Sequence, residues 1–189
     1  MGACIECNLP LGAGTGQRTA KVIGDKFSDR TTKRIGRTPG ALATFKAEIR
    51  LPLRIVHVTR NPFDMVARIA ISKVREGTPE EKVARATRYI DRLASINAGV
   101  IRAETQSVIT VRHESLVDDP QTELAGLCEF LGVDADPTYL AGCSAIVFPS
   151  PHRTRDLVDW KPAQEASVDD VISRYDFFSG YRLHEPDGG

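Results

Sequence analysis

An excess of charge of one sign is the first thing this sequence lacks. It contains 25 Lys and Arg residues against 25 Asp and Glu residues, so its formal net charge is zero. Without a net positive charge, the composition gives no support for binding nucleic acid or an anionic membrane. An anion-binding site in this chain must therefore come from a local concentration of Arg and Lys.

Long apolar runs and cysteines are also scarce. No run approaches the roughly 20 residues that a membrane helix needs, and residues 1–10 lack the basic-then-apolar pattern of a signal peptide. Of the four cysteines, Cys4 and Cys7 have CxxC spacing, but no second pair completes a zinc site and no strand precedes them. We therefore expect reduced thiols, no metal, no membrane association and a cytoplasmic location.

The remaining composition is that of an ordinary globular protein. The 189 residues are 41% hydrophobic and 26% charged, which is enough apolar material for one core. We expect a single domain over 1–189, in which 1–19 is a loop or disordered and 182–189 is a frayed tail.

Three short apolar segments predict buried strands, and stretches with helical spacing separate them. This alternation is typical of βαβ units, so the fold class is α/β, with a parallel sheet and helices on both of its faces. Three strands are few for such a sheet, which indicates that it is incomplete. The predicted strands cover 20–24, 53–59 and 107–112, and the predicted helices cover 41–48, 63–74, a segment starting at Thr78-Pro79, 120–131, 137–147 and 168–175.

The end of the second predicted strand carries a candidate anion site. Arg60 follows this strand, and Pro62 suits the first turn of the next helix. Ligands of open parallel sheets bind beyond the carboxyl ends of the strands, and the free N–H groups of a helix N-terminus attract anions. Asp64 lies in the first helical turn, so an ordinary Arg60–Asp64 pair is an equally good interpretation.

Several ordered segments resemble the sulfotransferase family. Arg60 to Asp64 (RNPFD) resembles its RNPxD segment, and Val111 to Pro120 resembles its RYEDL…DP segment. Lys26 resembles the strand-end lysine of these enzymes. The other matching segments are Glu129 to Gly132 with its FLG, the basic loop Phe148 to Arg155 followed by Trp160, and Gly180-Tyr181.

The resemblance implies a P-loop NTPase-like architecture and an activity. The reaction would be transfer of a sulfuryl group from PAPS, the activated sulfate donor, to a hydroxyl or amine of a small molecule or glycan. Lys26 would face the sulfuryl group, and Arg60 would bind the 3′-phosphate. Arg153 and Arg155 would belong to the late loop that contacts the 3′-phosphate and adenine, unless they are simply solvated. Arg68 stands where the family has a Ser or Thr ligand of the 3′-phosphate.

The sequence departs from this family at its start. Nothing before Lys26 resembles the family's strand followed by a [K/R]-S-G-T-T loop, whose N–H groups hold the 5′-phosphosulfate. The Gly-rich stretch 12–19 fits neither a Walker A nor a GxGxxG pattern, because Gln17 stands where the second glycine of Walker A and the third glycine of GxGxxG are required. We therefore expect an N-terminally incomplete sulfotransferase domain that binds PAP, the desulfated product, but turns over poorly.

A second interpretation is that the chain does not catalyse. It would then be a sulfotransferase-like remnant or subunit that binds nucleotide or a partner chain, either as a homo-oligomer or completed by a missing N-terminal portion. A P-loop kinase is disfavoured, because a Walker A lysine and a metal-binding carboxylate at a strand end are both lacking. The sequence identifies neither the acceptor substrate nor the residue that would act as general base.

Overall fold

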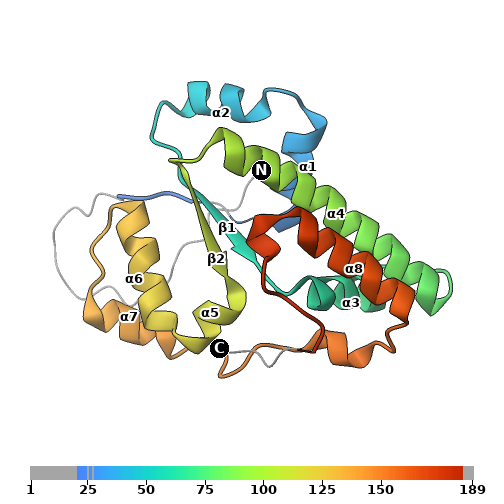
Figure 1. Cartoon of the computed structure of the whole chain (residues 1–189). Helices are drawn as coiled ribbons and strands as arrows, with labels where there is room; N and C mark the ends of the chain where they lie inside the picture. Colours follow the sequence, from blue (N-terminus) through green and yellow to red (C-terminus); the bar gives the residue numbers. More distant parts are fainter. Residues whose placement is uncertain (1–20, 25, 27, 185–189) are drawn as a thin grey trace.

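A two-stranded parallel sheet lies at the centre of the computed structural model (Figure 1), which describes residues 21–24, 26 and 28–184. Strand β1 (Ile55–Thr59) pairs with β2 (Val108–Arg112), with Ile55 opposite Val108 and Thr59 opposite Arg112. Both strands were expected from their β-branched residues, and their parallel pairing is confirmed. The α/β class is therefore correct.

Helices connect and surround these strands. Between β1 and β2 lie α3 (Pro62–Ser72) and α4 (Pro79–Ala103), which form the crossover connection that a parallel pair requires. The other elements are α1 (Ser28–Arg37), α2 (Ala41–Ile49), α5 (His113–Asp118), α6 (Pro120–Leu131), α7 (Pro137–Ser144), η1 (Thr154–Leu157), α8 (Pro162–Arg174) and η2 (Asp176–Phe178).

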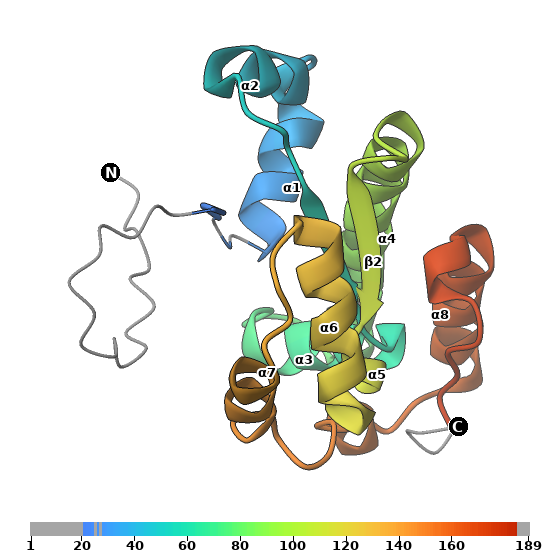
Figure 2. The same ribbon diagram turned by 90° about the vertical axis from the view of Figure 1, so that its left-hand side faces the viewer.

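The layers are clearest in Figure 2, where α4 and α6 lie on opposite sides of β2. The prediction of helices on both faces is therefore correct for this small sheet. The main core lies on the α4 side, where α3, α4, α8 and the C-terminal segment meet. Its fully buried members include Phe63, Ala86 and Val168, each 0% exposed. This core holds α3, and with it the residues at the end of β1.

Local signals fixed several helix ends. Thr78 caps α4 through a capping box with Glu81, and Pro79 occupies the first helical turn, as the sequence predicted. Gly132 ends α6 with a φ of 71°, a left-handed conformation that glycine adopts without steric cost.

The predicted first strand does not form. The described part of the 20–24 prediction, residues 21–24, is exposed coil, and the Ile23 side chain is 82% exposed. A strand needs a partner to bond its backbone groups, and β1 is hydrogen-bonded only to β2 within the described residues. The sheet is thus smaller by one strand than expected, and Lys26 does not sit at a strand end.

Helix α1 was not expected, because its sequence is a polar stretch. Packing against α4 explains it: Tyr89 donates a hydrogen bond to Asp29, and the Thr32 hydroxyl donates to the Asn97 Oδ1 at 3.0 Å. Gly36 also lies against Ile96, where an added Cβ would approach the Ile96 Cδ1 to 2.4 Å. The hydrogen bond from Lys33 lowers the pKa of Asp29 to about 2, so the Asp29 carboxylate is charged at neutral pH.

The start of the predicted frayed tail is fixed in place. The Arg182 carbonyl accepts a hydrogen bond from the Asn61 Nδ2 at 2.8 Å, and Leu183 is 9% exposed. Hydrogen bonds to distant side chains hold this segment, and its local sequence gives no signal of them. In the part of the chain that the structure describes, no helix is long and apolar enough to cross a membrane.

The core predicts a large cost for truncating Phe63. This side chain is 0% exposed and meets Trp160 edge-on at 5.1 Å between ring centroids. We expect Phe63→Ala to lower the free energy of unfolding by about 3–5 kcal/mol, measured by urea denaturation. Phe148→Ala is the matched control, because Phe148 is 74% exposed. Equal effects of the two substitutions would contradict the assigned core.

Burial of His57 predicts a pH dependence of stability. The Asn97 Oδ1 accepts a hydrogen bond from Thr32, so the group that Asn97 turns toward His57 is its Nδ2. This Nδ2 donates to the His57 Nε2 at 3.3 Å. Because the Nε2 accepts, the other ring nitrogen, Nδ1, donates to the Thr110 hydroxyl at 3.3 Å. Both ring nitrogens of His57 are therefore hydrogen-bonded. Burial lowers the pKa of His57, so the folded protein favours the neutral ring.

The contribution of His57 to stability is therefore fully present above its unfolded-state pKa of about 6.5 and is lost as the pH falls below it. We expect the free energy of unfolding to fall between about pH 7 and pH 5, and to fall less steeply in His57→Gln. Urea denaturation at each pH measures both slopes. Identical slopes would contradict this assignment.

Candidate functional site

The carboxyl end of β1 leads directly into helix α3. Asn61 caps this helix, because its side chain accepts a hydrogen bond from the Phe63 N–H at 3.0 Å, and Pro62 follows in the first turn. The cap is buried, since Asn61 is 2% exposed. Arg60 is therefore held at the positive end of the α3 dipole, where an anion is favoured.

A buried hydrogen-bond network fixes the ends of both strands. Glu114, which follows β2, accepts from the Asn61 N–H at 2.9 Å and from the Tyr181 hydroxyl at 2.7 Å. Burial raises the pKa of the Tyr181 hydroxyl, so it remains a donor. Arg112 lies over the Tyr181 ring at 4.0 Å. The C-terminal segment thus ties the two strand ends together.

Asp64 and Arg155 form a buried ion pair beneath this site. Their side chains are 1% and 0% exposed, and the Arg155 Nη1 lies 2.5 Å from the Asp64 Oδ2. The Arg155 backbone N–H donates to the Asp64 Oδ1 at 2.8 Å, and its Nε donates to the Leu183 carbonyl at 3.1 Å. This pair joins α3 to η1 and to the C-terminal segment.

Arg60 lies above this pair and touches the late basic loop. Its Nη2 donates to the His152 carbonyl and is 3.9 Å from the Asp64 Oδ2. Its side chain is 25% exposed, and its Nε has no hydrogen-bond partner within the described residues. Two segments that are 92 residues apart, one with Arg60 and one with His152 and Arg153, therefore meet at one helix N-terminus.

The predicted site residues differ in where they lie. Arg153 is half-buried and follows His152, whose carbonyl accepts the hydrogen bond from Arg60. The Arg153 Nε is 3.1 Å from the Asp156 carboxylate. Arg68 lies exposed on the second turn of α3, and its guanidinium has no hydrogen-bond or ion-pair partner among the residues that the structure describes. Lys26 is exposed coil just before α1. The structure brings Arg60 and the Arg153 segment together and shows no contact of either with Lys26.

Arg155 requires a correction. It was expected to bind phosphate or to be solvated, yet it is 1% exposed and its guanidinium is bonded to Asp64 and Leu183. The sequence does not separate it from Arg153, because both are arginines of one loop. Trp160 meets the Phe63 ring edge-on, and its Nε1 donates to the Arg155 carbonyl at 2.9 Å.

The network residues Asn61, Glu114 and Tyr181 were not predicted to have a role at the site. Asn61 before Pro62 is a recognisable capping signal, and this signal identifies it in the sequence. Glu114 and Tyr181 are 67 residues apart and give no comparable local signal.

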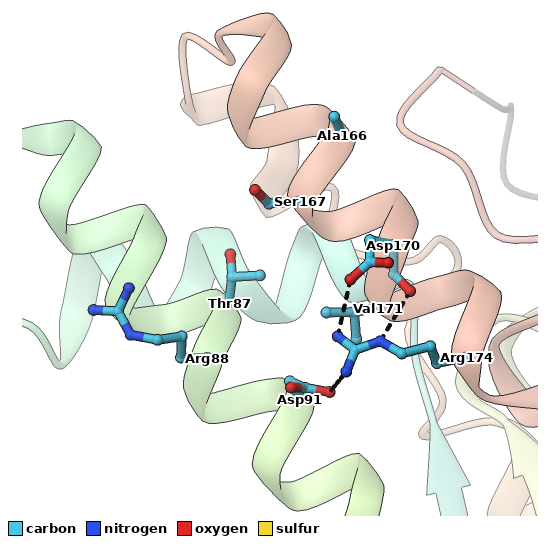
Figure 3. Close-up of a pocket in the computed structure, with 8 residues that line it drawn as sticks. All are labelled: Thr87, Arg88, Asp91, Ala166, Ser167, Asp170, Val171 and Arg174. Atoms are coloured by element: carbon cyan, nitrogen blue, oxygen red, sulfur yellow. Dashed lines mark hydrogen bonds and ion pairs between the residues drawn. The ribbon is translucent and has the colours of Figure 1, made fainter.

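The hollow between α4 and α8 contains none of the predicted site residues (Figure 3). It has a volume of about 400 Å³, and Arg174 lies across it, 3.0 Å from the Asp91 carboxylate and 3.2 Å from the Asp170 carboxylate. The charge of Arg174 is thus balanced by two carboxylates, Asp91 and Asp170, in the walls of the hollow. Over the described part of the chain, no group of three or more His, Cys, Asp or Glu side chains is placed to hold a metal ion.

Residues 52–137 match the model of a sulfotransferase family. The central part of this chain is therefore similar to the sulfotransferase family. The match contains β1, the Arg60–Asp64 segment, α3, α4, β2 and Glu114. The site's other parts, the His152–Arg155 loop and Tyr181, lie outside the matched residues. No curated protein and no solved structure matches the chain.

The buried ion pair between Asp64 and Arg155 predicts a large stability effect. Asp64→Ala leaves the Arg155 charge buried without its carboxylate, so we expect a loss of about 3–5 kcal/mol in the free energy of unfolding. Urea denaturation measures this loss. Asp156→Ala is the control: its carboxylate is 56% exposed and pairs with Arg153, so it should cost at most about 1 kcal/mol. A loss below 1 kcal/mol in Asp64→Ala would contradict the structural role of the pair.

Proposed function

We propose that this chain binds the 3′-phosphate of PAPS and of PAP at Arg60, as the nucleotide site of a sulfuryl-transfer domain. The observation that carries the proposal is the position of Arg60. Its guanidinium, in a side chain that is 25% exposed, lies at the α3 N-terminus and against the His152–Arg153 segment. The family match over this same strand end supports the proposal.

The physical basis is the combination of a planar cation with a helix N-terminus. A guanidinium binds two phosphate oxygens at once, and the helix dipole adds a favourable field for negative charge. The Asp64 carboxylate is neutralised mainly by Arg155, which is 2.5 Å away, whereas Arg60 is 3.9 Å away. The charge of Arg60 is therefore left largely available to a ligand.

In the proposed reaction, some residues bind the donor and another stabilises the sulfuryl group during transfer. PAPS supplies the sulfuryl group, which is transferred by in-line displacement to a hydroxyl or amine of the acceptor. Arg60 and Arg153 would hold the 3′-phosphate and so orient the donor, and Arg68 would reach it from the second turn of α3. Lys26 would stabilise the charge on the sulfuryl oxygens, a contribution typical of positioned donors in active sites. Arg155 supports Asp64 from beneath and does not touch the ligand.

A non-catalytic nucleotide-binding role is the second candidate. The observation that favours it is the place of Lys26, which lies in exposed coil instead of at a strand end. In that case the chain would bind PAP at Arg60 without accelerating sulfuryl transfer.

A thermal shift with PAP tests the nucleotide site. PAP at about 100 times its dissociation constant should add about 2.7 kcal/mol to the free energy of unfolding. Adenosine 5′-diphosphate is the matched ligand, because it has two phosphates but none on the 3′ oxygen, and it should give a smaller shift. Arg60→Ala should abolish the PAP shift, whereas Arg88→Ala, which removes an exposed arginine of α4, should retain it. Equal shifts in both variants would overturn the proposal.

A further inference from the structure

An apolar hollow lies between helices α6 and α7, and we call it the α6–α7 hollow. It has a volume of about 360 Å³, and its apolar lining includes Leu124, Leu127, Leu131 and Tyr139. This volume lies within the range of roughly 300–1,000 Å³ that is usual for binding pockets. Open apolar surface of this kind is unfavourable in water, so the hollow is a place where another apolar group gains by binding.

The chain around this hollow is acidic. Residues 113–152 contain no Lys or Arg, and their acidic residues are Glu114, Asp118, Asp119, Glu123, Glu129, Asp134 and Asp136. Asp134 belongs to the lining of the hollow. Lys21 lies 3.4 Å from its carboxylate, but this ion pair is weak because the two side chains are 67% and 94% exposed. The hollow is therefore suited to an apolar group that has a positive charge beside it.

The segment that leads from α2 into β1 carries such a group. Residues 50–54 read Arg-Leu-Pro-Leu-Arg, and Leu51 is 66% exposed. Arg50 ends α2 with a φ of 50°, a left-handed conformation that glycine adopts without steric cost. The Arg50 guanidinium is exposed and has no hydrogen-bond or ion-pair partner among the described residues. An exposed leucine with a basic neighbour thus complements the apolar hollow and its acidic surroundings.

This segment and the hollow lie on the same side of the molecule. Arg54 donates to the Phe130 carbonyl at 3.2 Å and lies over the Phe130 ring, which holds the segment against the end of α6. In Figure 1 the segment after α2 and helices α6 and α7 all lie on the left. Leu51 is not part of the lining of the hollow in its own chain. Two copies related by a twofold axis on this side can therefore present segment and hollow to each other reciprocally.

We propose that this chain forms a symmetric dimer, in which Leu51 of each copy enters the α6–α7 hollow of the other and Arg50 lies against Asp134. Such a contact buries an exposed apolar side chain in a pocket and pairs opposite charges around it, as protein interfaces commonly do. It uses neither Arg60 nor the late basic loop. The inference therefore goes beyond the proposed nucleotide site and does not depend on it.

Sedimentation velocity of the full chain tests the dimer. Between about 1 and about 100 μM protein at about 0.05 M salt we expect a monomer–dimer equilibrium, and about 0.5 M salt should raise its dissociation constant several-fold. Leu51→Asp should raise it at least about tenfold, because a carboxylate would enter the apolar hollow. Leu157→Asp is the matched control, since Leu157 is 75% exposed on η1, and it should change nothing. A chain that stays monomeric at the highest concentration, or equal effects of the two substitutions, would overturn the inference.

Charge reversal tests the contact at the edge of the hollow. Arg50→Glu and Asp134→Arg should each weaken self-association several-fold. An equimolar mixture of the two variants should associate about as tightly as the unmodified chain, because one Arg50–Asp134 contact is kept and the other has both charges reversed. A misfolded variant would show no such rescue. Absence of rescue between two variants that circular dichroism shows to be folded contradicts the contact.

Methyl NMR tests whether the hollow itself is covered. The Leu124 and Leu131 methyl signals should shift as the unmodified chain is concentrated, and should stay fixed in Leu51→Asp. Hexylamine is the probe for the alternative occupant, a small apolar amine. If hexylamine shifts these signals while the chain sediments as a monomer throughout, the hollow takes a small ligand and the dimer is wrong. A dimer whose Leu124 and Leu131 signals do not depend on concentration has its contact elsewhere, which also contradicts the inference.

Discussion

The buried ion pair between Asp64 and Arg155 is the contact on which the site depends. It lies under α3, and its backbone and side-chain hydrogen bonds hold η1 and the C-terminal segment against that helix. A buried pair of this kind is costly to break on one side only, because the remaining charge is left in a medium of low polarity. Asp64 is therefore neutralised mainly from beneath, by Arg155 at 2.5 Å, and less by Arg60 at 3.9 Å.

The hydrogen bonds of Glu114 hold the two strand ends of the sheet together. They join the end of β1, through Asn61, to the end of β2 and to Tyr181. Both strand ends are therefore placed by one carboxylate, and the α3 N-terminus cannot move independently of β2.

Local chemistry made several elements predictable. β1 and β2 are short β-branched segments that pair as expected, and the capping residues Thr78 and Gly132 mark helix ends that the structure confirms. The RNPFD segment identified the strand end, and the family match covers it. By contrast, α1 is polar along its length and is helical because α4 supplies partners for Asp29 and Thr32.

The sequence by itself determined the α/β class and the place of Arg60 at a strand end, because both follow from local patterns: strand-like and helix-like segments that alternate, and the RNPFD segment that follows one strand. The parallel pairing of β1 with β2 was expected from the helices between them, although the paired residues are far apart in the chain. Only the tertiary structure separated Arg155 from Arg153: two residues apart in one loop, the first is 1% exposed against Asp64 and the second is half-buried beside Asp156. It also decided that residues 21–24 lie unpaired, because a strand exists only where a neighbour accepts its hydrogen bonds. That neighbour is set by the whole fold and not by the segment.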